Sequence, residues 1–254
     1  LIEVGGVGKE FGAVRALSDV SLTVGAGEFV SVVGPSGCGK STLLEIIGGL
    51  QSPGSGSVKV GGAPLTGPRD ETAIIFQDAA MLPWRTVLDN VAFALESRGV
   101  GKAERRVRAR ELLGTVGLAD FAAHHPAQLS GGMRQRVAIA RAFSTGPDLI
   151  LADEPFGALD EQTRLLMSHE LLRVVERSTC AVLFITHSIQ EAVLLSDRVL
   201  VMSARPGRVL DEIPVPLPRP RDQGVPSSEE ARGLIDRIWA LIRDEARTAM
   251  MVAP

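Results

Sequence analysis

The sequence predicts an α/β fold with a mostly parallel sheet, a small antiparallel β subdomain and an inserted helical subdomain. Short, continuous apolar runs at residues 29–33, 149–152, 181–185 and 199–202 are typical of buried parallel strands. A long segment with helical spacing interrupts this series at residues 88–145. Alternating apolar and polar residues before and after the first run indicate antiparallel strands with one buried face.

The composition is that of an ordinary globular protein. The chain has 254 residues, 45% of them apolar and 22% charged, which is enough to bury a core. With 27 basic and 30 acidic residues the net charge is −3, so we expect no nucleic-acid partner. Cys38 and Cys180 lie far apart in sequence, which argues against a disulfide framework and for a reducing compartment.

Membrane-spanning and export segments are not recognisable in the sequence. No apolar run reaches the length of about 18 residues that a spanning helix needs. The first residues lack the charged segment followed by an apolar one that marks a secretory signal. We therefore expect any role at a membrane to depend on a partner.

Two separate segments have the alternation expected of the antiparallel subdomain. The first lies before residue 33, and we expect residues 15–18 to form a connector within it. The second lies in a turn-rich stretch, residues 52–67. The alternating positions are Val20, Leu22, Val24, Val58 and Val60. A further short apolar strand is predicted at residues 73–76, ending at Gln77.

The helical segment and the last part of the chain differ in composition. In the helical segment at residues 88–145 the spacing of apolar residues is clearest at Ala109, Leu112, Leu113 and Val116 and stops at Gly117. The arginines around these positions are interpreted as a solvated helix face. Five prolines between residues 206 and 220 predict an extended connector over the surface. Residues 221–254 are then predicted to form a helical extension. Its apolar stripe either packs on its own domain or contacts a partner, and consists of Leu234, Ile235, Ile238, Trp239 and Ile242.

A glycine-rich stretch between the strand at residues 29–33 and a run with helical spacing fits G-x-x-x-x-G-K-[ST], the phosphate-binding loop. Its glycines let the backbone bend so that N–H groups converge on an anion at a helix N-terminus. Lys40 supplies a charge for the β and γ phosphates, and Ser41 offers a hydroxyl ligand for Mg²⁺. The sequence therefore predicts a nucleoside triphosphate site in a P-loop NTPase core. The loop consists of Gly34, Pro35, Ser36, Gly37, Cys38, Gly39, Lys40, Ser41 and Thr42.

A second anion-binding helix end is predicted at residues 129–136, which read L-S-G-G-M-R-Q-R. Ser130 is expected at the N-cap, and Gly131 and Gly132 leave backbone N–H groups bare. This octet resembles the signature motif of ABC-type ATPases. In that family the signature of one subunit closes over the γ-phosphate that another subunit holds in its phosphate loop. The resemblance therefore implies ATP as the nucleotide and a second copy of the chain as a partner.

The resemblance extends over nearly the whole chain and implies an ABC ATPase domain at residues 1–220. Residues 149–154, L-I-L-A-D-E, resemble the Walker B strand. By that resemblance Asp153 holds Mg²⁺ and Glu154 polarises the attacking water as general base. Gln77 resembles the glutamine-loop residue that contacts Mg²⁺ and the water, and His187 resembles the switch histidine that contacts the γ-phosphate.

Two further positions resemble family elements at the edge of the nucleotide site. Phe11 stands where the family places an aromatic residue that stacks on adenine, commonly tyrosine. The chain has no tyrosine, and phenylalanine keeps the aromatic face; packing of Phe11 in the core is the alternative. Residues 158–160, A-L-D, resemble the D-loop, which runs across the dimer interface and would bring Asp160 there.

Three short runs narrow the resemblance to bacterial import ATPases for nitrate, sulfonates and taurine: L-P-W at residues 82–84, P-F-G-A-L-D at 155–160 and R-P-G-R at 205–208. In the family, the surface around Trp84 receives a coupling helix of an integral membrane permease; a core tryptophan is the alternative. The resemblance implies a peripheral protein on the cytoplasmic face of the inner (plasma) membrane, linked indirectly to a solute-binding protein. In the family the ATPase does not touch the cargo.

Two other functions are considered. A soluble ABC ATPase acting on DNA or ribosomes usually carries long coiled-coil insertions, zinc sites or two cassettes, and none is recognisable here. A regulatory protein that binds nucleotide without turnover would not need all of Lys40, Asp153, Glu154 and His187. The sequence therefore favours an ATP-hydrolysing import subunit.

Overall fold

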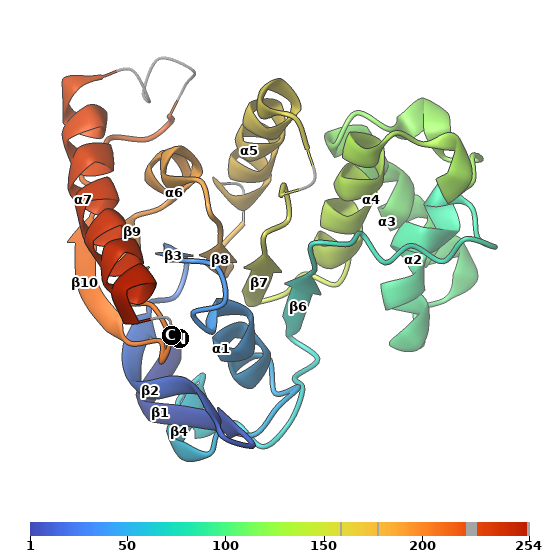
Figure 1. Cartoon of the computed structure of the whole chain (residues 1–254). Helices are drawn as coiled ribbons and strands as arrows, with labels where there is room; N and C mark the ends of the chain where they lie inside the picture. Colours follow the sequence, from blue (N-terminus) through green and yellow to red (C-terminus); the bar gives the residue numbers. More distant parts are fainter. Residues whose placement is uncertain (158, 177, 222–227, 253–254) are drawn as a thin grey trace. The chain divides into compact units, whose positions relative to one another are not determined.

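The computed structural model describes residues 1–157, 159–176, 178–221 and 228–252 (Figure 1). The chain divides into two compact units. The first unit consists of Leu1–Arg69 and Ala181–Pro254, and the second unit consists of Asp70–Cys180.

An antiparallel sheet forms the beginning of the first unit and confirms the predicted antiparallel β subdomain. Its strands are β1 (Ile2–Phe11), β2 (Val14–Val24), β4 (Ser55–Val60) and β5 (Ala63–Pro64), in the order β2-β1-β4-β5. The prediction of a connector at residues 15–18 is wrong, because these residues belong to β2. Irregularities in the register between β1 and β2 interrupt the alternation there, so the two buried residues Ala16 and Leu17 are neighbours in sequence.

The rest of the first unit is the mostly parallel part of the fold. β3 (Phe29–Val33) lies between β8 (Ala181–Ile185) and β9 (Arg198–Met202) and is parallel to both, and β10 (Val209–Pro214) adds an antiparallel edge beside β9. Every residue of β3 and β8 is buried, as continuous apolarity predicts. The helices of this part are α1 (Lys40–Ile47), α6 (Ile189–Leu195) and α7 (Glu229–Val252).

Helix α7 packs against its own unit, beside β9, β10 and α6 (Figure 1). Ile238 is fully buried in a core that also contains Val199 and Ile213, and three other members of the predicted stripe, Leu234, Ile235 and Ile242, border that core. Trp239, the fifth member of the stripe, does not join this core, since its exposed fraction is 54%. The helix begins beside Ser228, whose hydroxyl accepts a hydrogen bond from the Ala231 N–H (3.2 Å).

The proline-rich stretch is more regular than predicted. It contains β10, which Pro214 ends, and Val215 and Leu217 after it are buried rather than spread over the surface. Arg221 is buried as well, and its guanidinium donates to the carbonyls of Val193 (3.2 Å), Leu194 (3.0 Å) and Ser196 (2.7 Å). A cation at the C-terminal end of α6 offsets the partial negative charge of that helix end. Its donors also satisfy carbonyl groups that would otherwise be buried without partners.

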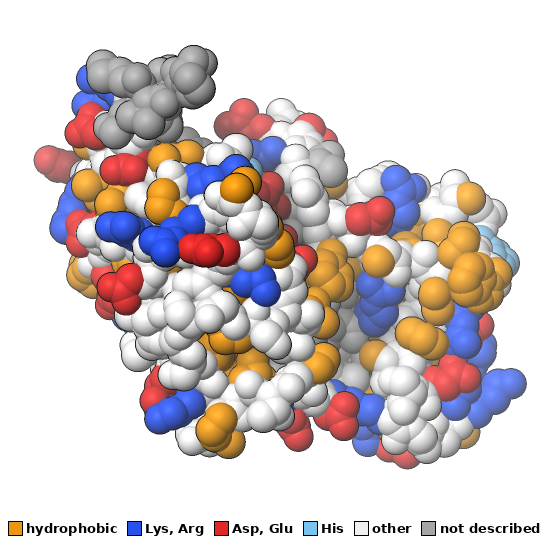
Figure 2. Space-filling view, turned by 60° about the horizontal axis from the view of Figure 1, so that its bottom comes forward, with side chains coloured by type: hydrophobic (Ala, Val, Ile, Leu, Met, Phe, Trp, Pro, Cys, Tyr) orange, Lys and Arg blue, Asp and Glu red, His pale blue; other side chains and the backbone are white. Residues whose placement is uncertain are grey.

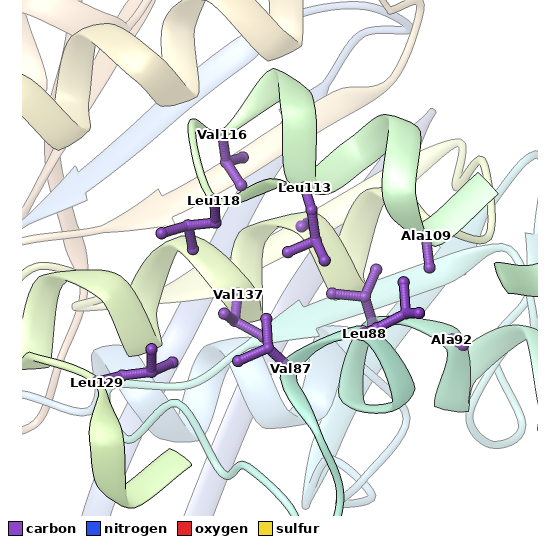
Figure 3. Packing of buried hydrophobic residues seen from close by; sticks show 11 residues of the cluster. Val87, Leu88, Ala92, Ala109, Leu113, Val116, Leu118, Leu129 and Val137 are labelled. Atoms are coloured by element: carbon purple, nitrogen blue, oxygen red, sulfur yellow. The ribbon is translucent and has the colours of Figure 1, made fainter. Parts of the chain in front are cut away.

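In the second unit a pair of parallel strands is accompanied by helices. The strands are β6 (Thr72–Ile75) and β7 (Leu149–Asp153). Between them the chain forms α2 (Val87–Ser97), α3 (Lys102–Thr115) and α4 (Gly131–Phe143), with short 3₁₀ turns η1 (Ala119–Phe121) and η2 (Pro126–Gln128); α5 (Glu161–Glu176) follows β7. Figure 3 shows the core of the three helices, with Val87 and Leu88 of α2, Leu113 of α3 and Val137 of α4 pointing toward one another.

The surface carries charges of both signs. In the view of Figure 2, basic and acidic side chains are interspersed, and hydrophobic side chains appear between them. The largest exposed apolar side chains include Trp84, which is 73% exposed, and Trp239. Among the described residues no helix is long and apolar enough to cross a lipid bilayer.

The helical core of the second unit makes a stability prediction. Leu113→Ala removes a fully buried side chain from the contact of α3 with α2 and α4, and should lower the free energy of unfolding by about 2–5 kcal/mol. The matched control is Leu166→Ala on α5, where the leucine is 56% exposed and the change should be within about 0.5 kcal/mol. Urea denaturation of the three proteins checks this. Equal midpoints for the two variants would contradict the assignment of the helical core.

Candidate functional site

The predicted phosphate loop, residues 34–42, connects β3 to α1 in the first unit. Gly39 stands at the N-cap of α1 with φ +103°, a conformation that only glycine adopts without strain. A Cβ atom on Gly39 would lie 2.7 Å from Leu17 Cδ2 and 2.9 Å from the Ala16 carbonyl oxygen. Gly39 is therefore required both by the bend of the loop and by its close contact with β2.

The Lys40 side chain folds back into the loop. It is 4% exposed, and its ammonium donates to the carbonyls of Gly34 and Pro35, both at 2.9 Å. Cys38 beside it is also buried, and burial raises the pKa of its thiol, so the thiol is protonated near neutral pH. The hydroxyl-bearing residues Ser36 and Ser41 are exposed. The loop thus combines a buried ammonium and exposed hydroxyls in one short segment at the N-terminus of a helix.

Two other predicted residues lie in the first unit. His187 is exposed and follows β8 in a turn whose two neighbouring residues are hydrogen-bonded. The Ser188 N–H donates to the Thr186 hydroxyl (3.0 Å). The Ser188 hydroxyl caps α6 by accepting a hydrogen bond from the Glu191 N–H (3.3 Å). Phe11 ends β1 and is 47% exposed, which excludes the core alternative. Its ring lies 5.4 Å from the Lys9 ammonium.

The second predicted anion site is the beginning of α4 in the second unit. Ser130 is its N-cap, as predicted, and its hydroxyl accepts from the Met133 N–H (3.3 Å). Gly131 is exposed and Gly132 is buried. A Cβ atom on Gly132 would lie 3.0 Å from Thr163 Cγ2, so α5 approaches the beginning of α4 closely.

Asp160 has a defined structural role at the beginning of α5. Its carboxylate accepts from the N–H (2.9 Å) and the hydroxyl (2.7 Å) of Thr163, which makes it the cap of that helix. These hydrogen bonds hold the pKa of Asp160 below its usual value. Ala158 of the predicted D-loop lies outside the described residues.

The predicted catalytic carboxylates follow β7. Asp153 is its last residue, and its Oδ1 atom is buried and has no hydrogen-bond partner in the described part of the chain. Glu154 has φ +45°, which is strained for a residue with a side chain. Gln77 lies nearby: a Cβ atom on Gly157 would be 3.2 Å from Gln77 Nε2 and 3.6 Å from Glu154 Oε2. The second unit therefore brings the side chains of Gln77 and Glu154 together near Gly157.

A cavity of about 350 Å³ within the second unit lies between the loop that begins at Gln77, the turn after Glu154 and the beginning of α4. It is lined by Gln77, Asp78, Ala79, Gly131, Arg134, Gln135, Pro155 and Leu159.

The predicted strand before Gln77 is shifted by one residue, since β6 ends at Ile75 and Phe76 is exposed. Gln77 is exposed too, on the loop that borders the cavity.

Three side chains connect this loop to the helices, and the sequence indicated this role for none of them, although Gln135 lies within the octet of residues 129–136. Arg141 of α4 donates to the carbonyls of Ala79 (2.6 Å) and Ala80 (2.8 Å), and Gln135 of α4 donates to the Phe76 carbonyl (3.4 Å). Asn90 of α2 is fully buried, and its amide accepts from the Leu82 N–H and donates to three carbonyls of residues 82–86. These contacts hold the segment from Gln77 to the exposed Trp84 against α4 and α2.

Trp84 lies at the end of this segment, residues 77–84. Its exposed fraction of 73% excludes the core alternative. Next to it, Arg85 pairs with Glu96 (2.5 Å) and its guanidinium lies 4.9 Å from the centroid of the Phe93 ring. An exposed tryptophan beside an ordered arginine and a half-exposed phenylalanine is an apolar surface on a rigid support.

Comparisons with known proteins agree with these features. Residues 17–157 match the family described as ABC transporter. A putative ATP-binding protein of Brucella abortus is 48% identical over 238 residues, 94% of this chain and 92% of that protein. The taurine import ATP-binding protein TauB of Burkholderia thailandensis is 51% identical over 199 residues, which are 78% of this chain and 76% of that protein. The aliphatic sulfonates import ATP-binding protein SsuB 2 of Burkholderia lata is 47% identical over 238 residues, which are 94% of this chain and 86% of that protein.

Solved structures give the same result. The dimeric post-hydrolysis structure of the ATP-binding cassette MJ0796 bound to ADP and Pi has a TM-score of 0.75 and 36% sequence identity, and the match covers 85% of this chain and 99% of that one. The chain therefore belongs to the ABC transporter family and has the P-loop NTPase fold of its ATPase subunits. It is an ATPase of that family.

The contacts of Arg141 make a prediction about the loop that follows Gln77. Arg141→Met keeps the apolar stem but leaves two carbonyls without their donor, which should cost about 1–3 kcal/mol of stability. Amide hydrogen exchange should become faster at residues 78–82. Arg110→Met on the exposed face of α3 is the matched control and should leave exchange there unchanged. Unchanged exchange in the Arg141 variant would contradict this role.

Proposed function

We propose that this chain is the ATP-hydrolysing subunit of an importer of a small solute, namely an aliphatic sulfonate, taurine or nitrate. The observation that carries the proposal is the presence of two anion-binding helix ends in one ABC-family chain, the lysine-bearing loop at residues 34–42 and the Ser130-capped end of α4. The solute class is supported by the printed names of the taurine and aliphatic sulfonate relatives.

In this proposal the loop of residues 34–42 binds the phosphates of ATP. Lys40 exchanges its contacts with the Gly34 and Pro35 carbonyls for the β and γ phosphates, and the N–H groups at the beginning of α1 complete the cradle. Phe11 stacks on the adenine, which its exposure permits.

Oxygen donors in the chain fit Mg²⁺, a hard cation. The proposed ligands are the exposed Ser41 hydroxyl, the Gln77 side-chain carbonyl and Asp153, directly or through water; the buried Oδ1 atom of Asp153 without a partner supports this assignment. When bound, Mg²⁺ neutralises charge on the phosphate oxygens.

Catalysis is assigned to the residues at the end of β7 and to two polar side chains. Glu154 accepts a proton from the attacking water, Gln77 orients that water, and His187 donates a hydrogen bond to the γ-phosphate. The closeness of Gln77 and Glu154 beside Gly157 supports their joint action. A second copy of the chain supplies Ser130, Gly131, Gly132 and Asp160 to close over the ATP, and the dimeric cassette among the structural relatives supports this arrangement.

The remaining assignments concern the whole assembly. Residues 1–220 form the ABC ATPase domain, with the helical subdomain at about 88–145, and residues 221–254 form a C-terminal helical extension. The subunit is peripheral on the cytoplasmic face of the inner membrane, and integral membrane permease subunits dock near Trp84. A solute-binding protein is an indirect partner. The alternative of a soluble ABC ATPase acting on DNA or ribosomes is not favoured, since the relatives named for a function are import proteins.

Hydrolysis is tested with Glu154→Gln, which removes the base but keeps the shape of the side chain. The variant should bind ATP and Mg²⁺, lose phosphate release by about 10²–10⁴-fold and accumulate as a dimer in gel filtration. Glu111→Gln, on the exposed face of α3, is the matched control and should behave like the wild type. A variant that keeps hydrolysing ATP at the wild-type rate would show that Glu154 is not the base.

Docking of the permease is tested with the two tryptophans of the chain, both of which are exposed. Trp84→Ala should reduce co-purification with co-expressed permease subunits about tenfold or more, since an exposed aromatic anchor commonly contributes 2 kcal/mol or more to an interface. Trp239→Ala on α7 is the matched control and should leave co-purification unchanged. The reverse result would move the docking surface to the C-terminal helix.

A further inference from the structure

A loop near the C-terminal helix contacts the outer face of the phosphate loop. Residues 204–207, here called the clamp loop, lie between β9 and β10 in the first unit. The Arg205 guanidinium donates two hydrogen bonds to the Gly37 carbonyl oxygen, from Nε (3.1 Å) and Nη2 (3.0 Å). Hydrogen bonds from a charged donor are the stronger kind in proteins. Arg205 therefore holds one peptide group of the phosphate loop from outside.

This contact determines where a neighbouring N–H group points. In a trans peptide the carbonyl and the following N–H point in opposite directions. Because the Gly37 carbonyl faces Arg205, the Cys38 N–H faces the inside of the phosphate loop, where it reaches the Pro35 carbonyl only at 3.4 Å. Such a long bond is weak and easily exchanged for a better acceptor. Arg205 thus keeps an N–H donor aimed at the position of a bound anion.

The clamp loop itself is held firmly. Gly207 donates to the Ala16 carbonyl (2.9 Å) and its own carbonyl accepts from the Ser18 N–H (3.0 Å), so it is joined to β2. A Cβ atom on Gly207 would lie 2.1 Å from the Cys38 carbonyl oxygen, a distance that excludes any side chain. The clamp loop and the phosphate loop are therefore packed backbone against backbone.

The C-terminal helix completes this arrangement. The Glu245 carboxylate of α7 accepts a hydrogen bond from the Ala204 N–H at 2.9 Å, next to Arg205. Helix α7 is anchored in the core of the first unit by Ala231 and Ile238, both fully buried. A continuous set of contacts thus runs from α7 through Glu245 and Arg205 to Gly37.

We propose that Arg205 is a positioning residue for the phosphate loop and that α7 supports it through Glu245. The proposal rests on the proposed function, in which residues 34–42 bind the phosphates of a nucleotide. It assigns to the C-terminal helix a role in nucleotide affinity: the helix stabilises the clamp loop, and the clamp loop orients the Cys38 N–H. Neither residue touches the nucleotide.

The test measures ADP binding to the full chain by calorimetry. Arg205→Ala should raise the Kd for ADP about tenfold, Arg205→Lys should give an intermediate value because lysine donates a single hydrogen bond, and Glu245→Ala should raise the Kd about threefold. Amide exchange of residues 38–40 without nucleotide should become faster in the Arg205→Ala variant. Matched controls are Arg208→Ala beside the clamp loop and Asp236→Ala on α7, both exposed, which should leave affinity and exchange unchanged.

A double variant tests the link between the two residues. Adding Glu245→Ala to Arg205→Ala should raise the Kd no further, because Glu245 acts through the loop that carries Arg205. Additive effects would overturn the role of α7, and wild-type affinity and exchange in Arg205→Ala would overturn the role of Arg205. A much larger loss for ATP than for ADP would instead mean that Arg205 touches the γ-phosphate, which also overturns the proposal. If the wild type binds no ADP, it is the proposed function that fails.

Discussion

The bent backbone of residues 34–42 is the constraint on which the first unit depends. A loop bent in this way leaves peptide carbonyls without partners in a helix or strand, and those carbonyls need donors. Lys40 satisfies the carbonyls of Gly34 and Pro35, and Arg205 satisfies that of Gly37. The backbone of β2 and of residue 207 must also come within contact distance of the loop, which explains why glycine occupies positions 39 and 207. The surrounding strands are therefore part of the proposed phosphate site.

The second unit meets a related constraint at the end of β7. Glu154 has a positive φ, which costs about 1–3 kcal/mol for a residue with a side chain and persists only where neighbouring contacts enforce it. The turn that follows supplies one such contact, since the Gly157 N–H donates to the Glu154 carbonyl (3.0 Å). The Glu154 carboxylate and the Gln77 amide both lie close to Gly157. A strained position beside a second polar side chain is consistent with the proposed role of Glu154 as a base that meets a water molecule.

The sequence predicted those parts of the molecule that have a local pattern. Continuous apolarity placed β8 at residues 181–185, with the bounds that the structure has. The glycine-rich loop, the Ser130 cap and the carboxylates after β7 lie on the elements that their motifs indicated. Local patterns failed where long-range contacts decide the structure. The register irregularities between β1 and β2 interrupt the alternation, so residues 15–18 were predicted to be a connector although they belong to β2.

Hydrogen bonds from charged side chains to distant carbonyls could not be predicted for the same reason, because no local sequence pattern indicates them. Arg221 reaches carbonyls 25 to 28 residues away, Arg141 reaches 61 and 62 residues away, and Arg205 reaches 168 residues away. In sequence Arg141 and Arg221 are two arginines among many, for which a solvated surface is the default interpretation. Arg205 stands out only as part of the R-P-G-R run, which pointed to a group of relatives and not to this contact. Only the fold shows that these three arginines satisfy backbone carbonyls: Arg205 in the loop of residues 34–42, Arg141 in the loop after Gln77 and Arg221 at the end of α6.

The central claim is that residues 34–42 hold the phosphates of ATP. Equilibrium binding of ATP with Mg²⁺ to the wild type and to Lys40→Ala tests it most directly, with circular dichroism to show that both are folded. The account predicts saturation at one ATP per chain for the wild type and loss of binding in the variant, since the loop keeps its N–H groups but loses its only ammonium. Wild-type affinity for ATP in the folded Lys40→Ala variant would contradict it.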